Sequence, residues 1–333
     1  MMLNIMNKGC HGMIQSYSLG YIRKTNIIKG YCKLWSLIKD SYFTIPKDCK
    51  IRIYNKSYQV EYDFYHDITP LRDYIGVKLP IIKSLSFNYW TYEYNIVMED
   101  LSGYESYLSG VNYDNCINIL EQMAKFHLFF LDNFQSINCW QHGGHWTDDK
   151  RDKTDFCNKL SLMKQNFRDN FNYSFDESEI IKIIRQNKSQ TDNFLTKQNT
   201  IIHGDFKIGN FFQNNTDLYL IDFQWVGKGH CITDICYFVV TSLQYGDLTT
   251  SNCLNIIKRY MGCFPEEVSN SFISDFMCCL LDLFQYFVCY KWYNISPEIL
   301  QYNREENIDG LHVRYFEQIT SIINLVLEFY MFI

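Results

Sequence analysis

The stretch that decides the fold is residues 201–240, which read IIHGDFKIGNFFQNNTDLYLIDFQWVGKGHCITDICYFVV. Two short β-like runs in this region each lead into a carboxylate, the first into Asp205 and the second, residues 218–221, into Asp222. Asn210 follows Asp205 by five positions, which is the spacing of the Asp and the Asn in the catalytic loop of protein kinases. The joint pattern predicts a loop that carries chemistry between two short strands.

These residue types fit the needs of phosphoryl transfer. The reaction needs a group that orients the acceptor hydroxyl, ligands for Mg²⁺, and positive charge on the nucleotide phosphates. An Asn carbonyl and an Asp carboxylate are hard oxygen ligands that suit Mg²⁺. The alternative interpretation is that the same Asp and Asn side chains only form turns, which is their commonest role. The fixed spacing of several such residues favours phosphoryl transfer.

The same region resembles the core of the aminoglycoside phosphotransferase and choline kinase superfamily. The Asp-Phe-Gln sequence at 222–224 and the downstream Asp234 resemble its ecdysteroid kinase-like branch. The resemblance implies an α+β, protein-kinase-like fold of two lobes, and an enzyme that uses ATP and Mg²⁺ to phosphorylate a hydroxyl group of a small molecule. It also implies a catalytic base (Asp205), ligands for Mg²⁺ (Asn210 and Asp222) and supports of the catalytic loop (His203 and Asp234).

Further matches to this family lie upstream. Residues 60–65, VEYDFY, resemble its E-x-x-F-Y helix, so we expect Glu61 to pair with the lysine that binds the nucleotide phosphates. That lysine should lie at the end of a preceding strand, and Lys39, after the sequence LWSLI, fits this expectation. The competing candidates are Lys33, Lys47 and Lys50.

Residues 94–101, YNIVMEDL, resemble the strand and the hinge between the two lobes of this family. There the backbone of Glu99, Asp100 and Leu101 would meet the adenine edge. The alternative is an ordinary strand that ends in an acidic turn. The downstream sequence LEQMAKFH matches the A-x-x-H helix of the family, and we interpret its His127 as a packed core histidine rather than a catalyst.

One part of the family pattern is weak. A Gly-rich loop should cover the phosphates, but the N-terminal region offers only GCHG at residues 9–12 and Gly20, without convincing spacing. The alternative function is therefore a catalytically silent kinase-like module that binds a nucleotide or a metabolite. The intact catalytic and metal-binding positions favour the enzyme.

The chain changes character near residue 102. The first hundred residues carry β-like runs and one helical candidate, whereas the later residues mostly follow helical spacing. We therefore expect a nucleotide-binding lobe at 1–102 and a catalytic and substrate-binding lobe at 103–333. The expected early strands are 13–22, 26–39 and 94–98, and the expected helices are 58–68, 114–132, 177–185, 233–244, 265–293 and 304–332.

Several other classes of protein are less favoured. A protein kinase has a long activation segment, which binds peptide substrates, between the metal-binding Asp and the Asp of the next helix. Here Asp222 and Asp234 are only twelve positions apart. The GxxxxGK[ST] sequence of a P-loop enzyme does not occur. A formal net charge of −6 argues against a protein that tracks nucleic-acid phosphates.

Two groups of side chains leave other roles open. Cys139, His142 and His145 have a spacing that could suggest zinc, but a fourth ligand is not evident. Aromatic side chains in the C-terminal helices could line a pocket for a cation or a sterol-like acceptor, although such stripes more often form core. These side chains are Phe284, Tyr286, Phe287, Tyr290, Trp292 and Tyr293.

The composition predicts a folded cytoplasmic protein. Of 333 residues, 47% are hydrophobic, which excludes wholesale disorder. The 13 cysteines are irregularly spaced and several lie in apolar runs, as expected for reduced thiols. We expect no signal peptide, because Asn4, Asn7 and Lys8 interrupt the N-terminal run. We also expect no run that reaches the length of a membrane span, because the best candidate, 276–290, is broken by Asp282 and Gln285. A small molecule is the expected partner, with no nucleic acid and no membrane, and the oligomeric state stays open.

Overall fold

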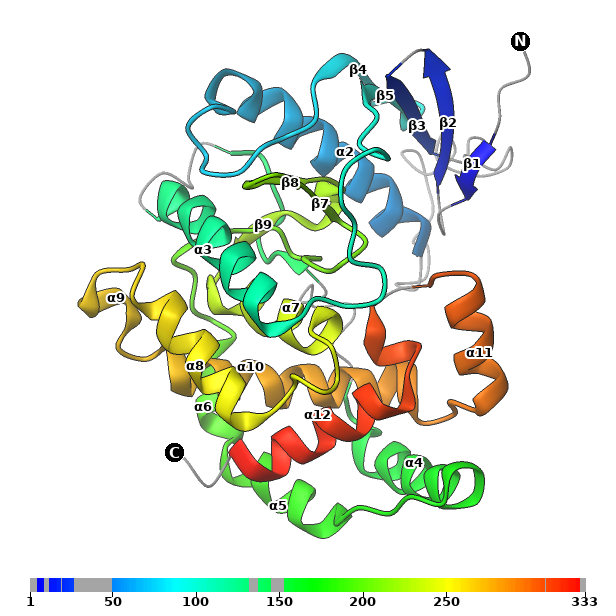
Figure 1. The fold of residues 1–333 in the computed structure, drawn as a ribbon, viewed down its shortest axis with the longest axis vertical. Helices are drawn as coiled ribbons and strands as arrows, with labels where there is room; N and C mark the ends of the chain where they lie inside the picture. The colour runs from blue at the N-terminus through cyan, green and yellow to red at the C-terminus, as the bar shows by residue number, and fades with distance from the viewer. Residues whose placement is uncertain are drawn as a thin grey trace, which may run out of the picture.

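A computed structural model of the chain describes residues 5–8, 12–18, 20–26, 50–131, 137–144, 153–308 and 310–329. Figure 1 shows a small antiparallel sheet with one long helix beside it at the top of the view, above a larger assembly of helices. This arrangement confirms the α+β, two-lobed, protein-kinase-like fold that the sequence predicts. The boundary expected near residue 102 stays a prediction.

The N-terminal sheet has five antiparallel strands in the order β1-β2-β3-β5-β4. Gly20 lies in the turn between β2 and β3 with a φ of 75°, a conformation that favours glycine. This turn divides the run expected at 13–22 into two strands, and most of the strand expected at 26–39 lies outside the described residues. The strands are β1 (Ile5–Lys8), β2 (Gly12–Ser18), β3 (Tyr21–Asn26), β4 (Ile82–Asn88) and β5 (Glu93–Glu99).

One helix, α2 (Lys50–Ile68), packs against this sheet and contacts β4 and β5. Its second half is the helix that the sequence predicts. Phe64 and Tyr65 are buried on the face where Ile68 also lies, at helical spacing. Glu61 lies one turn before them on the same face and is fully buried, so the helix carries a carboxylate into the interior.

The larger half of the molecule is built around α7 (Ile232–Ser242), all of whose residues are buried. It packs against α10 (Phe272–Phe287), which is also largely buried. A helix that is covered on every side belongs at the centre of a domain, and the other helices lie around this pair (Figure 1). They are α3 (Tyr113–Phe130), α4 (Phe156–Phe171), α5 (Glu177–Gln186), α6 (Lys188–Phe194), α8 (Thr250–Met261), α9 (Glu266–Ser269), α11 (Pro297–Glu305) and α12 (Phe316–Phe329).

The last two expected helices are interrupted in the structure, so the prediction of continuous helices is wrong there. Residues 265–293 form α9, α10 and then a π-helical turn, η6 (Val288–Trp292). Residues 306–315 separate α11 from α12. Asn307 follows the end of α11 with a φ of 53°, a common way to end a helix. Gly310 packs so closely that a Cβ there would lie 2.7 Å from a backbone oxygen.

One helical run, Glu266–Trp292, is long and apolar enough to cross a membrane by length and composition, with a mean hydropathy of 1.6. The expectation that no run reaches this length is therefore wrong. In the fold, 78% of its apolar window is buried, as in the core helix of a globular protein. The neighbouring helices α7 and α6 cover much of it.

Two small two-stranded sheets carry the stretch quoted first, so the β-like runs predicted there are strands. Residues 203–210 form the loop between the first and the second of these strands. Asp222 follows the third strand by two positions, so both predicted aspartates come after the end of a strand. The sheets pair β6 (Thr200–Ile202) with β9 (Gly227–Gly229), and β7 (Phe211–Asn214) with β8 (Asp217–Leu220).

Candidate active site

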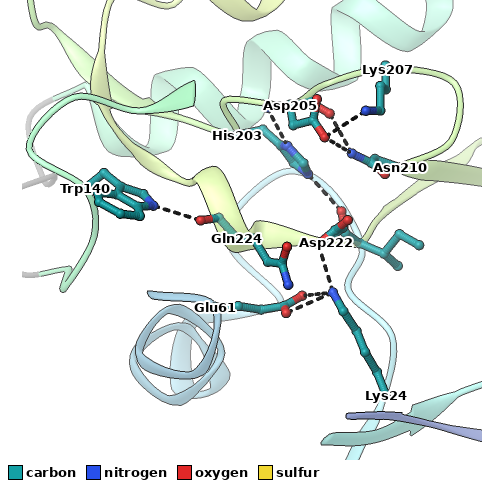
Figure 2. A network of polar contacts seen from close by, with 10 residues as sticks. Lys24, Glu61, Trp140, His203, Asp205, Lys207, Asn210, Asp222 and Gln224 are labelled. Carbon is teal, nitrogen blue, oxygen red and sulfur yellow. Dashed lines mark hydrogen bonds and ion pairs between the residues drawn. The ribbon is translucent and has the colours of Figure 1, made fainter. Parts of the chain in front are cut away.

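The loop at residues 203–210 is closed by hydrogen bonds around Asp205, which is only 5% exposed. The side-chain amide of Asn210 donates to the Asp205 carbonyl oxygen (2.7 Å) and to its Oδ2 (3.0 Å). The Lys207 ammonium lies 3.1 Å from the same Oδ2 (Figure 2). The backbone N–H of Asn210 also donates to the carbonyl of Lys207 at 2.8 Å, so one tight turn holds all three side chains. The predicted base therefore has a positive charge beside it.

Asp222 is brought to this loop by the backbone before it. The N–H of Ile221 donates to the Asn210 carbonyl at 3.0 Å, and the His203 ring donates through Nε2 to the Ile221 carbonyl at 2.9 Å. Asp222 itself has a φ of 64° and a ψ of 60°, a left-handed conformation that Asp adopts more readily than most residues. The structure thus brings Asp205, Asn210 and Asp222 into one site.

Asp234 lies behind the start of the loop at residues 203–210. Its carboxylate accepts hydrogen bonds from the backbone N–H of His203 at 2.6 Å and of Gly204 at 2.9 Å. Gly204 has a φ of 81°, and a Cβ there would lie 2.2 Å from the backbone oxygen of Trp225. Glycine is therefore required at this position. The structure places His203 and Asp234 where the predicted support of the loop needs them.

The lysine that meets Glu61 is Lys24 on β3, whereas the predicted Lys39 lies outside the described residues. The Lys24 ammonium lies 2.9 and 3.0 Å from the two Glu61 carboxylate oxygens and 2.8 Å from Asp222 Oδ1 (Figure 2). In the sheet, β3 pairs with β5, and Lys24 stands opposite the buried Ile96. This register directs the Lys24 side chain toward α2. The lysine predicted from the sequence, Lys39, comes later in the chain.

The ion pairs of Lys24 are largely shielded from water. The Lys24 side chain is 13% exposed and that of Glu61 is fully buried. Burial alone would lower the pKa of Lys24, but Asp222 and Glu61 outweigh it and hold that pKa above its ordinary value. Burial also raises the pKa of Glu61, an effect that the Lys24 ammonium opposes. The site therefore keeps a permanent cation between two carboxyl groups.

Phe223, next to Asp222, packs the two halves of the site together. Its ring stacks on Phe64 of α2 with centroids 4.2 Å apart, and it lies 4.7 Å from the His203 ring. Aromatic pairs at such distances add to the stability gained by burial. The helix that carries Glu61 is thus fixed against the segment that carries Asp222.

Glu99, Asp100 and Leu101 lead the chain out of β5 toward the helical half. The N–H of Glu99 donates to the Ile81 carbonyl at 2.9 Å, and the N–H of Asp100 donates to the Gly20 carbonyl at 2.9 Å. The side chain of Leu101 is buried. The sheet therefore holds this segment firmly, and the contact of its backbone with adenine stays a prediction.

Cys139, His142 and His145 are described only in part, so a zinc site there is not tested. Among the residues that the structure describes, no three His, Cys, Asp or Glu side chains are placed to hold a metal ion, and His145 lies outside them. The His142 ring contacts the side-chain amide of Gln198, and the distance from His142 Nδ1 to Gln198 Nε2 is 3.1 Å. Half of the C-terminal aromatic residues are core, namely Phe284, Phe287 and Trp292.

Two lysines at the site were missed by sequence reasoning, although each carries a signal. Lys207 lies inside the quoted loop, two positions after Asp205. Lys24 lies two positions after Ile22 on β3, so the two side chains share one face of the strand. A lysine that alternates with an apolar residue in a short strand points its ammonium over the buried face.

The sequence itself matches a known family. A sequence model of the ecdysteroid kinase-like family matches residues 36–270, which is most of the chain. A comparison with curated protein sequences gives no match. The family match spans both the predicted lysine partner, Glu61, and the whole catalytic loop.

Solved structures of small-molecule kinases have this fold at low sequence identity. An amicoumacin kinase in complex with AMP-PNP and Ca²⁺ gives a TM-score of 0.53 and 11% identity, covering 99% of this chain and 92% of its own. A microcompartment-associated aminopropanol kinase gives a TM-score of 0.53, 11% identity, and coverage of 99% and 92%. An aminoglycoside phosphotransferase from Alicyclobacillus acidocaldarius gives 0.50 and 10%, with coverage of 99% and 93%. Likeness at this level of identity shows the fold alone.

Proposed function

Because the chain belongs to the ecdysteroid kinase-like family, we propose that it transfers a phosphoryl group from ATP to a hydroxyl group of a small molecule, with the help of Mg²⁺. The observation that carries the proposal is the meeting of five side chains from separate parts of the chain. Two come from β3 and α2, and three from the catalytic loop and the end of β8. They are Lys24, Glu61, Asp205, Asn210 and Asp222.

Lys24 supplies positive charge for the nucleotide phosphates. Its ammonium is fixed by the buried Glu61, so it reaches a phosphate oxygen without first being ordered. A hydrogen bond between two charged groups is stronger than a neutral one. The role of Glu61 in this account is to hold the lysine in place and to preserve its charge.

Asn210 and Asp222 have the oxygen donors that Mg²⁺ prefers. Asp222 is 34% exposed, so a hydrated metal–nucleotide complex can reach it. Asn210 lies close by, because its backbone carbonyl oxygen accepts a hydrogen bond from the N–H of Ile221, the residue before Asp222. These two side chains would hold the ion, which when bound neutralises charge on the phosphates. Because Lys24 contacts Asp222, the metal-binding and phosphate-binding groups are neighbours.

Asp205 orients the acceptor hydroxyl and accepts its proton as the hydroxyl oxygen bonds to the γ-phosphorus of ATP and the bond from that phosphorus to ADP breaks. The nearby Lys207 ammonium offsets the repulsion between this carboxylate and the negative phosphoryl group. Asn210, through its side-chain amide, keeps the carboxylate in one orientation. The loop therefore presents a fixed base beside a cation.

A small acceptor suits the chain between Asp222 and Asp234 better than a peptide does. The structure describes this whole interval, in which η5 (Phe223–Trp225) and β9 are followed at Ile232 by α7. These short elements leave no room for a peptide-binding platform. By their names, the structures with this fold include kinases of amicoumacin and aminopropanol. Amino alcohols, sugars, aminoglycosides and steroid-like alcohols are thus the acceptors to test.

The proposal is tested by Asp205→Asn in an ADP-release assay across a panel of such hydroxyl compounds. We expect ADP release by the wild type with at least one compound, and turnover by the variant that is lower by about 10³-fold, as for loss of a general base. Asp217→Asn, an exposed carboxylate at the start of β8, is the matched control and keeps wild-type turnover. Equal turnover by Asp205→Asn and the wild type removes the proposal.

The alternative is a silent kinase-like module, which rests on the weak Gly-rich loop, whose residues 9–11 lie outside the described residues. It makes a different prediction: ATP raises the melting temperature, but no compound of the panel leads to ADP release. The ion pairs around Lys24 and Asp205 favour the enzyme.

A further inference from the structure

Behind the catalytic loop, a chain of buried polar side chains links α8 to α7 through α3. The Tyr260 hydroxyl on α8 lies 2.6 Å from Nδ1 of His127 on α3. The other ring nitrogen, His127 Nε2, lies 3.2 Å from Oδ2 of Asp234 on α7. None of these residues is more than 1% exposed. Three helices therefore meet at the carboxylate that holds the catalytic loop.

The donors and acceptors of this chain follow from their chemistry. The Asp234 carboxylate already accepts the N–H groups of His203 and Gly204, and as a carboxylate it has no proton to donate. The hydrogen between it and the imidazole therefore lies on His127 Nε2. A neutral ring protonated there has a lone pair on Nδ1, which accepts the Tyr260 hydroxyl. Burial raises the pKa of Tyr260 well above its ordinary value, so the hydroxyl keeps its proton.

We propose that Tyr260 and His127 are positioning residues for the catalytic loop. By donating to Nδ1, the Tyr260 hydroxyl holds the His127 ring in place, and the Nε2–H of this ring fixes the Asp234 carboxylate behind the loop. The two backbone groups that Asp234 binds immediately precede Asp205. The placement of the catalytic carboxylate therefore depends on a hydroxyl group of α8. The catalytic part of this inference rests on the proposed function, whereas the protonation of the ring does not.

The Tyr260 ring also packs in the core, so packing must be separated from hydrogen bonding. Its ring centroid lies 4.9 Å from that of Phe264 and 5.7 Å from that of Phe272. The Cys231 thiol lies beside the same hydroxyl and is its second polar neighbour. Tyr260→Phe keeps the ring contacts and removes only the hydroxyl group. A role in packing alone therefore predicts little change in this variant.

The hydrogen-bonding role predicts a specific defect. Without the Tyr260 hydroxyl, the lone pair on His127 Nδ1 loses its donor in a buried site, which is unfavourable. The ring then keeps only the hydrogen bond from Nε2–H to Asp234, so it can tilt in its site. A ring held at one nitrogen only makes a poorer hydrogen bond to Asp234, and the support of His203 and Gly204 weakens. The defect thus reaches the catalytic loop without any change in it.

The first test is the protonation of His127 in the folded wild type, read by ¹⁵N NMR of histidine-labelled protein, with His127→Gln to assign its signals. We expect a protonated Nε2 and an unprotonated Nδ1. A ring protonated on Nδ1, alone or together with Nε2, overturns the proposal. The measurement needs no nucleotide and no acceptor, so its failure is distinct from a failure of the proposed function.

The second test is Tyr260→Phe. Tyr173→Phe is the matched control, because it removes a tyrosine hydroxyl group whose contact, with Asn324, is exposed. We expect Tyr260→Phe to move the ¹⁵N signal of His127 Nδ1, which loses its hydrogen bond, and to speed hydrogen exchange at the Gly204 amide by roughly tenfold. In the ADP-release assay, kcat should fall about tenfold while the KM for ATP stays within about twofold. An unchanged Nδ1 signal, or unchanged exchange and kcat, overturns the proposal. If the variant does not fold, the protonation of His127 in the wild type, read in the first test, decides whether the proposal stands.

Discussion

The two halves of the candidate active site are held together by different means. In the C-terminal half, Asp205, Asn210 and Asp222 lie on one short stretch of chain, where backbone hydrogen bonds fix much of their geometry. In the N-terminal half, Lys24 and Glu61 are 37 positions apart and meet because a helix packs on a sheet. The ion pair between Lys24 and Asp222, at 2.8 Å, joins the halves.

Because the two halves are held together differently, we expect substitutions in them to have different effects on activity and stability. Removing the Lys24 charge leaves the backbone of the sheet and of α2 as it is, so activity should fall more than stability. A backbone change at Gly204 distorts the loop itself, so stability should fall as well. The following variants, from the largest expected effect to the smallest, test that contrast.

Lys24→Met tests the N-terminal half. We expect kcat/KM for ATP to fall about a hundredfold or more, because the cation on the phosphates is lost. The fold should tolerate the change, since burial raises the pKa of Glu61 and a protonated Glu61 needs no partner charge. ADP release measures the first effect and thermal melting the second. A kcat/KM within a few-fold of the wild type would contradict this role.

Lys39→Met tests which lysine binds the nucleotide phosphates: Lys24, which the structure places beside Glu61, or Lys39, which the sequence predicts. With Lys24 as the phosphate-binding lysine, the Lys39 variant should bind ATP about as well as the wild type. Titration of both variants with ATP makes the comparison. A loss at Lys39 as large as that at Lys24 would return the role to Lys39.

Gly204→Ala tests the backbone of the C-terminal half. We expect the free energy of unfolding to fall by about 3 kcal/mol, because the φ of 81° is strained for alanine and the new Cβ meets a backbone oxygen at 2.2 Å. Urea unfolding measures the change. Gly246→Ala is the control, since nothing lies within 4 Å of its Cβ position. Equal stability of the two variants would show that the loop can move aside.

Lys207→Met tests the charge beside the catalytic base. We expect kcat to fall about tenfold, with ATP affinity nearly unchanged, because the ammonium lies beside Asp205 rather than at the Lys24 site. Lys207→Arg should retain more of the activity, since it keeps the charge. Steady-state kinetics of both variants measure the contrast. An equal loss in both variants would mean that the charge is not what matters.

The smallest effect concerns His230, which lies between β9 and α7. Burial lowers the pKa of His230 from its ordinary value of 6.5 to about 4, although the Asp275 carboxylate opposes the shift. The unfolded chain therefore takes up a proton that the folded protein refuses, and stability is lost as the pH falls from 6.5 toward 4. We expect a loss of about 1 kcal/mol by about pH 5.5. Urea unfolding at this pH and near neutrality should show it in the wild type and not in His230→Gln.

The C-terminal half could be predicted residue by residue. Asp205, Asn210 and Asp222 are close in sequence, and the spacing between them is set by the loop and strands that they occupy. Each also belongs to a residue type that suits one chemical task. Sequence reasoning placed His127 in the core, but could not show that it touches Asp234, because this contact joins two helices far apart in the chain.

The N-terminal half could be predicted only in part. Glu61 is marked by the resemblance of residues 60–65 to the E-x-x-F-Y helix of the family, but its partner depends on which strand pairs with β5 and in which register. Local sequence does not determine such a pairing, so Lys39 was chosen where the structure has Lys24. The break between α11 and α12 could not be predicted for the same reason, because it depends on how closely Gly310 packs against Thr241, which lies far away in the sequence.

The two halves meet at Asp222, so the metal dependence of ATP binding tests the central claim most directly. Isothermal calorimetry would compare ATP binding by the wild type and by Asp222→Asn, each with and without Mg²⁺. The account predicts that Mg²⁺ strengthens ATP binding by the wild type and has little effect on the variant. The same gain from Mg²⁺ in both proteins, or no ATP binding by the wild type, would contradict it.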